Sequence, residues 1–371
     1  MTGQSSDWTS AVTAPARALI IGAGLIGTSV ALALREHGGE VWLADSDPAT
    51  AKMAADLGAG TAVADLRDAT EIADVAVLAV PPAAVATTLA QAQELAVACV
   101  YTDVASVKAL PVRQAREAGC DLATYVPGHP LAGREKHGPA AARADLFLGR
   151  TWALCPLPEN DPLAIDAVTS LVTACGADPV RVDPQTHDQW VALVSHAPHV
   201  VSAAMAARLG QPSVPAQALR LAGQGLRDVT RIAAGDAALW AQILAANAGP
   251  VAAVLQAVSD DLADIACALA EEDPDAATAL LGRGNAGAAR IPGKHGGKPP
   301  ELTVVQVVIA DQPGELARLF NAAGEAGVNI EDIRIEHSPG LPVGVAELSV
   351  RPAAAARLLD AMEAGGWPVR R

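Results

Sequence analysis

Gly22-Ala23-Gly24-Leu25-Ile26-Gly27 decides the fold of this chain of 371 residues. The hexapeptide follows an apolar run at residues 18–21 and precedes an alanine- and leucine-rich stretch, so it lies between a predicted strand and a predicted helix. In that context G-x-G-x-x-G is typical of dinucleotide binding. The first glycine permits the tight turn, the second lets the backbone approach a pyrophosphate, and the third allows close helix–sheet packing. The alternative is a plain glycine-rich turn.

Further apolar runs alternate with helical stretches after this turn, as the βαβ units of a parallel sheet require. The predicted strands are residues 18–21, 41–44, 75–80, 99–102 and 123–126. Residues 151–155 and 180–182 bracket a helix around residues 163–175 and are candidates to extend the sheet. The predicted fold class is therefore α/β, with an N-terminal Rossmann-type parallel sheet over residues 15–183 and a disordered tail at residues 1–14.

The end of the second predicted strand indicates which dinucleotide binds. Asp45 lies there, eighteen residues after Gly27, and a carboxylate at this place accepts the hydroxyls of the adenosine ribose and repels a 2′-phosphate. No arginine or lysine follows before Lys52, so NAD is favoured over NADP. The alternative role of Asp45 is to begin the turn at Asp47-Pro48. Val80 ends a later strand where the chain passes beside the dinucleotide.

Two polar segments after later strands carry candidate catalytic residues. His129 lies in a stiff loop, Gly128-His129-Pro130, and a neutral imidazole with an ordinary pKa near 6.5 is suited to accept a hydroxyl proton. Its alternative is a solvated loop histidine. Ser106, in Asp103-Val104-Ala105-Ser106, either caps a helix or hydrogen-bonds the imidazole or the nicotinamide carboxamide, and the sequence leaves these roles open.

The second half of the chain changes pattern twice. Residues 184–281 are expected to form an all-helical second domain for substrate binding and dimerisation, with turns at Gly210-Gln211-Pro212 and Gly249-Pro250. Residues 282–300 have the composition of a linker. Residues 301–371 show the order βαββα, with Asp311-Gln312-Pro313-Gly314 after the first strand, which predicts a small ferredoxin-like domain.

The helical block holds polar residues in apolar surroundings. Ser195 and His199 are four residues apart and therefore share a helical face, although Pro198 complicates the geometry. His196 and His199 lack a third ligand at a suitable spacing, so no metal site is expected. An arginine of the segment 227–231 is expected to bind a substrate carboxylate, because a guanidinium matches it bidentately; a surface ion-pair cluster is the alternative.

The composition excludes other classes of protein. A net charge of −15 argues against a nucleic-acid partner, since no basic stripe neutralises phosphates. Five scattered cysteines indicate buried thiols in a reducing compartment. No signal peptide and no uninterrupted apolar stretch of membrane-spanning length is present, so we expect a soluble, cytoplasmic protein without a membrane partner.

Five segments together resemble the prephenate/arogenate dehydrogenases of tyrosine biosynthesis in their order and approximate spacing. They are residues 22–27, 103–108, 128–135, 187–199 and 225–233, and the resemblance runs from about residue 17 to residue 281. Asp311-Gln312-Pro313-Gly314 with Gly327-Val328-Asn329-Ile330 resembles an ACT domain, an amino-acid-sensing module. The resemblance covers nearly the whole ordered chain. Its departures, Thr28 and Arg134, do not change the assignment.

The resemblance implies NAD-dependent oxidative decarboxylation of prephenate to 4-hydroxyphenylpyruvate and CO2. It implies that His129 accepts the proton of the ring hydroxyl, supported by Ser106, and that Arg231 holds a substrate carboxylate in a pocket lined by His199. The remaining substrate-site positions implied are His196, Ser195, Glu135, Asp228 and Trp240. The regulatory positions implied are Asp311, Pro313, Gly314, Asn329 and Ile330, for an aromatic amino-acid effector. A homodimer is implied as well.

Three rival interpretations remain at this point. An arogenate dehydrogenase would differ only in how the pocket treats a side-chain amino group. A β-hydroxyacid dehydrogenase usually relies on a lysine in the helical domain, and none occurs between Lys136 and Lys294. A non-catalytic amino-acid sensor would not need the set His129, Ser106 and Arg231.

Overall fold

The computed structural model describes residues 14–133, 137–291, 301–337 and 342–370. Contacts between residues divide the chain into two compact units, Met1–Ser259 and Asp260–Arg371, and each is described by itself. The predicted disordered tail, except Ala14, lies outside the described residues, as does Glu135.

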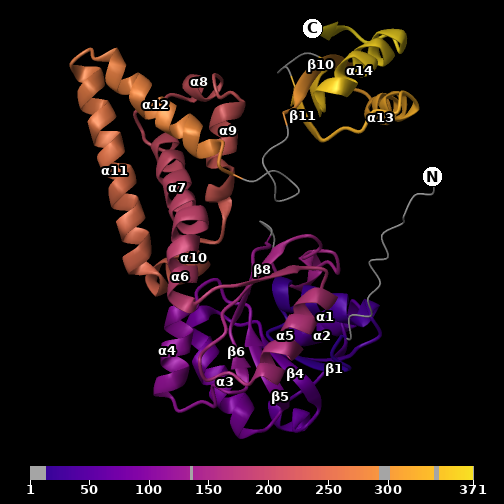
Figure 1. Ribbon diagram of the computed structural model, residues 1–371, viewed down its shortest axis with the longest axis vertical. Helices are drawn as coiled ribbons and strands as arrows, with labels where there is room; N and C mark the ends of the chain where they lie inside the picture. The colour runs from indigo at the N-terminus through magenta and orange to yellow at the C-terminus, as the bar shows by residue number, and fades with distance from the viewer. Residues whose placement is uncertain (1–13, 134–136, 292–300, 338–341, 371) are drawn as a thin grey trace. The chain divides into compact units, whose positions relative to one another are not determined.

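The first unit is built on a six-stranded parallel sheet (Figure 1). Its strand order is β3-β2-β1-β4-β5-β6, the doubly wound order in which the chain reverses direction between β1 and β4. This confirms the predicted parallel sheet; the short β3 was not predicted. The strands are β1 (Arg17–Ile21), β2 (Glu40–Ala44), β3 (Thr61–Ala62), β4 (Ala73–Leu78), β5 (Ala98–Asp103) and β6 (Tyr125–Val126).

Helices cover both faces of this sheet because successive strand side chains alternate between them. Ala18 and Ile20 pack in one apolar cluster with α1, α2 and α5, while Leu19 and Ile21 pack in the other with α3 and α4. Both faces are therefore buried, as a parallel sheet requires. The covering elements are α1 (Leu25–Glu36), α2 (Pro48–Asp56), α3 (Val85–Glu94), α4 (Ala109–Glu117) and α5 (Pro162–Ala174), with the short turns η1 (Leu66–Ala69), η2 (Pro82–Ala84) and η3 (Pro139–Ala141).

A second, three-stranded sheet corrects one expectation. Residues 151–155 and 180–182 do not extend the six-stranded sheet; as β8 (Thr151–Leu154) and β9 (Asp178–Arg181) they pair with each other, and β8 also pairs with β7 (Gly128–Pro130). His129 therefore lies in a strand, opposite Ala153, and not in a loop as expected. The pairings of Gly128 with Leu154 and of Pro130 with Trp152 fix the backbone on either side of a histidine that was expected in a stiff loop.

The helical part of the first unit begins with one continuous apolar helix, residues 184–209. It comprises α6 (Pro184–Val191), a π-helical turn η4 (Ala192–His196) and α7 (Ala197–Leu209). The predicted turn at Gly210 is confirmed, since α7 ends there, but Gly249 and Pro250 lie inside a helix and the break falls at Asn247. The helices that follow are α8 (Ala216–Leu219), α9 (Gln224–Thr230), η5 (Arg231–Ala234), α10 (Ala237–Ala246) and α11 (Ala248–Ala270).

By length and composition alone the helix 184–209 is apolar enough to cross a membrane, as is the bent pair α10 and α11 taken together. Buried polar side chains on the first helix hydrogen-bond to the nucleotide-binding part: Asp188 to the start of α4, and His187 to His129. Through these hydrogen bonds the helix 184–209 packs against the nucleotide-binding part of the same chain.

The cysteines differ in part from expectation. All five are free, and Cys155 and Cys175 are buried, with burial raising the pKa of each thiol to about 12. Cys99 and Cys267 are exposed, so the expectation of buried thiols was wrong for these two.

The second unit ends in a small antiparallel sheet with strand order β11-β12-β10-β13. The chain order is βαββαβ, which adds to the predicted βαββα a short fourth strand and is the ferredoxin-like order. The predicted linker was wrong in part, because residues 282–288 belong to α12 (Pro274–Ala288). The other elements are β10 (Thr303–Ala310), α13 (Glu315–Glu325), β11 (Asp332–His337), β12 (Val343–Val350), α14 (Pro352–Ala364) and β13 (Val369–Arg370).

Candidate active site

The glycine turn lies at the carboxyl ends of β1 and β4. Gly22 has φ +105°, and a Cβ there would meet Ala79 O at 2.3 Å; a Cβ on Gly27 would meet Gly22 O at 2.0 Å. A side chain at either position therefore forces the neighbouring backbone to shift. Around Gly24, in contrast, a Cβ would meet no atom within 4 Å, so the second glycine borders open space.

These residues fit a dinucleotide. No side chain caps the N-terminus of α1 at Gly24, which leaves the first-turn N–H groups for a pyrophosphate. Asp45 Oδ2 accepts a hydrogen bond from Ala23 N at 2.7 Å, and Oδ1 accepts one from Asp47 N at 2.9 Å. The carboxylate thus joins the glycine turn to the end of β2, and Asp45 is partly exposed, as a contact with the adenosine ribose requires.

A buried ion pair follows β5. Lys108 and Asp103 are fully buried and in contact; Lys108 Nζ also donates to Gly128 O at 2.5 Å, and Tyr125 donates its hydroxyl proton to Asp103 Oδ2 at 2.7 Å. A buried charge pair is tolerated only when its remaining hydrogen bonds are made, as they are here. The pair ties the end of β5 to the residue before His129.

Ser106 lies in the same turn, half-buried, but it does not cap a helix. The N-cap position of α4 is Lys108, and the capping carboxylate comes from Asp188 of α6, which accepts from Lys108 N at 2.7 Å and from Ala109 N at 2.9 Å. The capping role weighed for Ser106 is therefore wrong. Its roles toward imidazole and nicotinamide stay predictions.

His129 is linked to the helical part through a second histidine. His129 Nδ1 lies 2.9 Å from His187 Nε2, the two rings meet edge to face, and His187 Nδ1 lies 2.8 Å from Asp188 Oδ1. His187 and Asp188 are buried, whereas His129 is partly exposed. Burial, followed by the neighbouring His187 and Lys108, holds the pKa of His129 well below its usual value, so the imidazole is neutral at pH 7. A neutral, partly exposed imidazole can accept a proton.

A second cluster surrounds Trp240 on α10. The His199 ring stacks on the Trp240 indole at 3.6 Å between centroids, and His196 meets the same indole edge-on at 6.0 Å. His196 Nδ1 lies 3.1 Å from Nδ2 of Asn247, which also donates to Asp188 O at 2.8 Å. Burial lowers the pKa of His196 to about 4. The structure thus brings together three predicted residues, His196, His199 and Trp240.

The nucleotide-binding part lies against this cluster. Helix α10 packs on η2, which begins two residues after Val80. The short helix η5, which begins with Arg231, packs on α7; at its end a Cβ on Gly235 would meet Trp240 Nε1 at 2.7 Å and His199 Cε1 at 3.0 Å. Arg231 is exposed, as is Asp228, whose carboxylate accepts from Gln224 at 3.0 Å. Ser195 is half-buried within the π-helical turn, so its predicted alignment with His199 does not follow regular α-helical spacing.

Among the residues that the structure describes, no three histidine, cysteine or acidic side chains group as a metal site requires. Histidine pairs in this site are held by hydrogen bonds and ring stacking instead.

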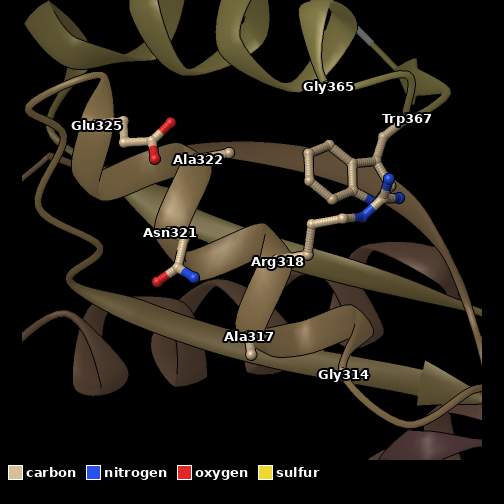
Figure 2. Close-up of a pocket in the computed structure, with 8 residues that line it drawn as sticks. All are labelled: Gly314, Ala317, Arg318, Asn321, Ala322, Glu325, Gly365 and Trp367. Atoms are coloured by element: carbon tan, nitrogen blue, oxygen red, sulfur yellow. The ribbon is translucent and has the colours of Figure 1, made fainter.

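A cavity of about 490 Å³ in the second unit lies between α13 and the end of α14 (Figure 2). The Arg318 guanidinium lies 4.2 Å above the Trp367 ring, and both side chains hydrogen-bond to Glu315. Of the predicted regulatory residues only Gly314 lines this cavity; Asp311, Pro313, Asn329 and Ile330 do not. Its full lining is Gly314, Ala317, Arg318, Asn321, Ala322, Glu325, Gly365 and Trp367.

Five residues of the first unit were given no role from the sequence although they build the site: Asp103, Lys108, His187, Asp188 and Asn247. A signal existed, because charged residues in apolar stretches must find partners when buried. Their partners are distant in the chain, however, so the sequence alone did not pair them.

The chain matches known proteins over most of its length. Residues 30–181 match the nucleotide-binding domain of prephenate dehydrogenase, and residues 183–283 match its dimerization domain. The chain is 41% identical over 363 residues to a Streptomyces niveus protein described as "Probable prephenate dehydrogenase NovF", covering 95% of this chain and 98% of that protein.

Two solved structures share the fold. The A. aeolicus prephenate dehydrogenase in complex with hydroxyphenyl propionate and NAD+ superposes with a TM-score of 0.67 at 26% identity, covering 73% of this chain and 96% of that one. The Synechocystis arogenate dehydrogenase superposes with a TM-score of 0.63 at 26% identity, covering 74% of this chain and 100% of that one. The chain therefore belongs to the prephenate dehydrogenase family and is an NAD-dependent dehydrogenase.

Proposed function

We propose that this dehydrogenase oxidises and decarboxylates prephenate to 4-hydroxyphenylpyruvate with His129 as the general base. The observation that carries the proposal is the neutral, partly exposed His129 ring, which is fixed between β8 and His187 at the carboxyl edge of the nucleotide-binding sheet. Ligands bind at this edge in open α/β sheets, so the base lies where the reacting ring carbon is expected.

The protein has two tasks in this reaction. His129 accepts the proton of the ring hydroxyl, with Ser106 supporting the imidazole and the hydroxyl. Arg231 holds a substrate carboxylate, while His196, His199 and Trp240 form the wall of the pocket. The glycine turn and Asp45 would hold NAD, which would supply the acceptor for the hydride on the carbon that carries this hydroxyl. Loss of the ring carboxylate as CO2 then restores aromaticity, which drives the reaction forward without a metal ion.

A homodimer in the cytoplasm is part of the proposal. Large apolar side chains on the helix 184–209 are exposed, among them Trp190, Leu193 and Val194 at 57%, 61% and 66%. Such a patch is costly in water and typical of an interface between subunits. Its position within the segment that matches a dimerization domain supports pairing with a second copy.

Residues 301–371 are proposed to be an ACT-type regulatory domain for an aromatic amino acid. The βαββαβ order and the left-handed Gly314 (φ +89°) at the start of α13 support this assignment. Asp311, Pro313, Gly314, Asn329 and Ile330 remain the proposed effector residues.

A NADH-formation assay tests the function. Prephenate and arogenate are each supplied with NAD and with NADP, with and without tyrosine. Turnover of prephenate with NAD is expected. Turnover of arogenate but not of prephenate would show that arogenate is the substrate. Inactivity with both compounds would favour a non-catalytic amino-acid sensor. Undiminished rates with NADP would show that Asp45 does not exclude the 2′-phosphate.

A further inference from the structure

The carboxylate of Asp188 lies at the N-terminus of α4 and accepts on both oxygens. Lys108 N donates to Oδ1 at 2.7 Å and Ala109 N donates to Oδ2 at 2.9 Å. A backbone N–H can only donate, so this carboxyl group is held as an ionised acceptor. The positive end of the helix dipole favours the same charge state. Asp188 is 3% exposed, which shields its charge from water.

The charge of Asp188 determines where the protons of the two histidines lie. His187 Nδ1 is 2.8 Å from Asp188 Oδ1 and must donate to it, which leaves a lone pair on His187 Nε2. That nitrogen is 2.9 Å from His129 Nδ1, so His129 Nδ1 carries a proton and donates it to His187. A neutral imidazole has one N–H, and His129 Nε2 is therefore unprotonated.

We propose that His187 and Asp188 are positioning residues that fix the tautomer of His129, so that Nε2 is the proton-accepting atom. This inference rests on the proposed role of His129 as the base. When Nε2 accepts the substrate proton, the imidazolium that forms stays hydrogen-bonded to His187, with the Asp188 carboxylate behind it. Among the described residues, the other cation beside His129 is Lys108, whose charge is balanced by Asp103.

The geometry distinguishes this arrangement from a merely satisfied core histidine. A structural histidine needs partners but no particular tautomer, whereas here two backbone donors set the polarity of the whole chain of hydrogen bonds. His187 is 2% exposed and does not reach solvent, while His129 at the end of the chain does. The donor-to-acceptor direction of the hydrogen bonds is therefore set at the helix terminus and carried to the partly exposed His129.

The test uses the full-length enzyme with three variants: Asp188→Asn, His187→Gln and His187→Leu. An asparagine that donates to His187 reverses the chain of hydrogen bonds and moves the His129 proton to Nε2. We expect kcat of Asp188→Asn to fall about 10²–10⁴-fold, the scale of losing a correctly protonated general base, with little change in KM. Glutamine can still accept from His129 Nδ1, so His187→Gln should retain a kcat about 10–100-fold above that of His187→Leu, the value of one charged hydrogen bond.

The tautomer itself is read by ¹⁵N NMR of histidine-labelled protein near pH 7. The His129 signals, assigned with His129→Asn, should show a protonated Nδ1 in the wild type and in His187→Gln, and a protonated Nε2 in Asp188→Asn. His37→Gln and Asp56→Asn are matched controls, since both residues are exposed and distant from the site. Melting temperature and NAD affinity identify any variant that fails to fold; His187→Gln leaves the cap of α4 intact and keeps the test decisive.

The outcomes separate this inference from the proposed function. If His129→Asn loses activity but both His187 variants and a folded Asp188→Asn retain wild-type kcat, the positioning role is wrong and the base remains. A protonated Nε2 on His129 in the free wild-type enzyme would also overturn it. If His129→Asn itself retains normal kcat, the proposed base fails first.

Discussion

His129 Nδ1 lies 2.9 Å from Nε2 of His187, although 58 residues separate the two in the chain. The first residue lies in strand β7 and the second in helix α6, so the contact joins the nucleotide-binding part of the enzyme to its helical part. The proposed base is therefore held from both sides of the site. Movement of α6 relative to the sheet would displace the imidazole, which makes this contact central to the predictions below.

Replacing His129 by asparagine should abolish general-base catalysis. We expect kcat to fall about 10²–10⁴-fold while the Kd for NAD stays nearly unchanged, because the glycine turn is not altered. Steady-state kinetics with prephenate and a titration with NAD measure the two effects. His37→Asn, an exposed histidine after α1, is the matched control and should behave as wild type. A near-normal kcat in His129→Asn would remove this residue from its role.

Acid should destabilise the folded enzyme through its buried neutral histidines. The pKa of His196 is lowered by burial from 6.5 to about 4, and that of His129 is lowered as well. The unfolded chain then binds more protons, so the stabilisation is complete above pH 6.5 and is lost as the pH falls toward 4. The contribution of neutral His196 to the free energy of unfolding is at most roughly 3 kcal/mol. Melting temperatures between pH 7.5 and 5 should fall less steeply in His196→Gln than in the wild type or His37→Gln; equal slopes would contradict the prediction.

Two glycines of the turn should respond differently to alanine. Gly24→Ala places its Cβ in open space, so the protein should fold normally but bind NAD more weakly, by tenfold or more for a loss of about 1.4 kcal/mol. In Gly27→Ala the Cβ meets Gly22 O at 2.0 Å, so we expect a lower melting temperature, by several degrees for about 1–3 kcal/mol of overpacking. Thermal unfolding and NAD titration of the two variants, each compared with the wild type, measure these effects. Unimpaired NAD binding by Gly24→Ala would show that the cofactor does not approach there.

Arg231→Ala should chiefly raise KM for prephenate. A charged, bidentate hydrogen bond to a carboxylate accounts for about a 10–100-fold loss of binding. Arg227→Ala, on the preceding helical turn, is the comparison and should leave KM within about twofold, as for a surface charge. If the larger effect follows Arg227 instead, the carboxylate has been assigned to the wrong arginine of this segment.

Removing residues 301–371 tests the proposed regulation. A chain ending at Pro300 should keep its KM for prephenate and lose inhibition by tyrosine, measured as the change in NADH formation with increasing tyrosine. In the intact chain, Asn329→Ala should weaken the same inhibition, since this exposed side chain lies between α13 and β11. Unchanged tyrosine sensitivity of the shortened chain would place the effector elsewhere.

The predicted elements with local signals were confirmed. Five strands of the parallel sheet and α5 follow from short apolar runs that alternate with helical stretches, and the roles of Gly22 and Gly27 follow from steric rules that act within one turn. The short strands β3 and β13 were not predicted, because two residues carry no period. The strand character of His129 was also not predicted, since β7 has three residues and exists only through its pairing with β8.

Asp188 illustrates the same limit within the site. It was expected to be one polar residue of a helix, yet it caps α4 from 80 residues away and orders two histidines. Ser106, three residues before that helix, is of a type that favours capping, yet it does not cap α4. Capping preference is a weak local energy of about 1 kcal/mol, and a buried carboxylate with two N–H partners outweighs it.

The amino-acid sequence by itself determined the class of this protein: a parallel sheet with a dinucleotide turn, a helical block, and a small α/β domain, with a histidine as candidate base. These features depend on residue type and on spacings of a few residues. Only the tertiary structure decided which side chains hold that histidine, because buried polar groups must pair with whatever the fold brings within hydrogen-bond distance, at any separation in the chain. His187 and Asp188 received their place from the fold, and through them His129 received its orientation.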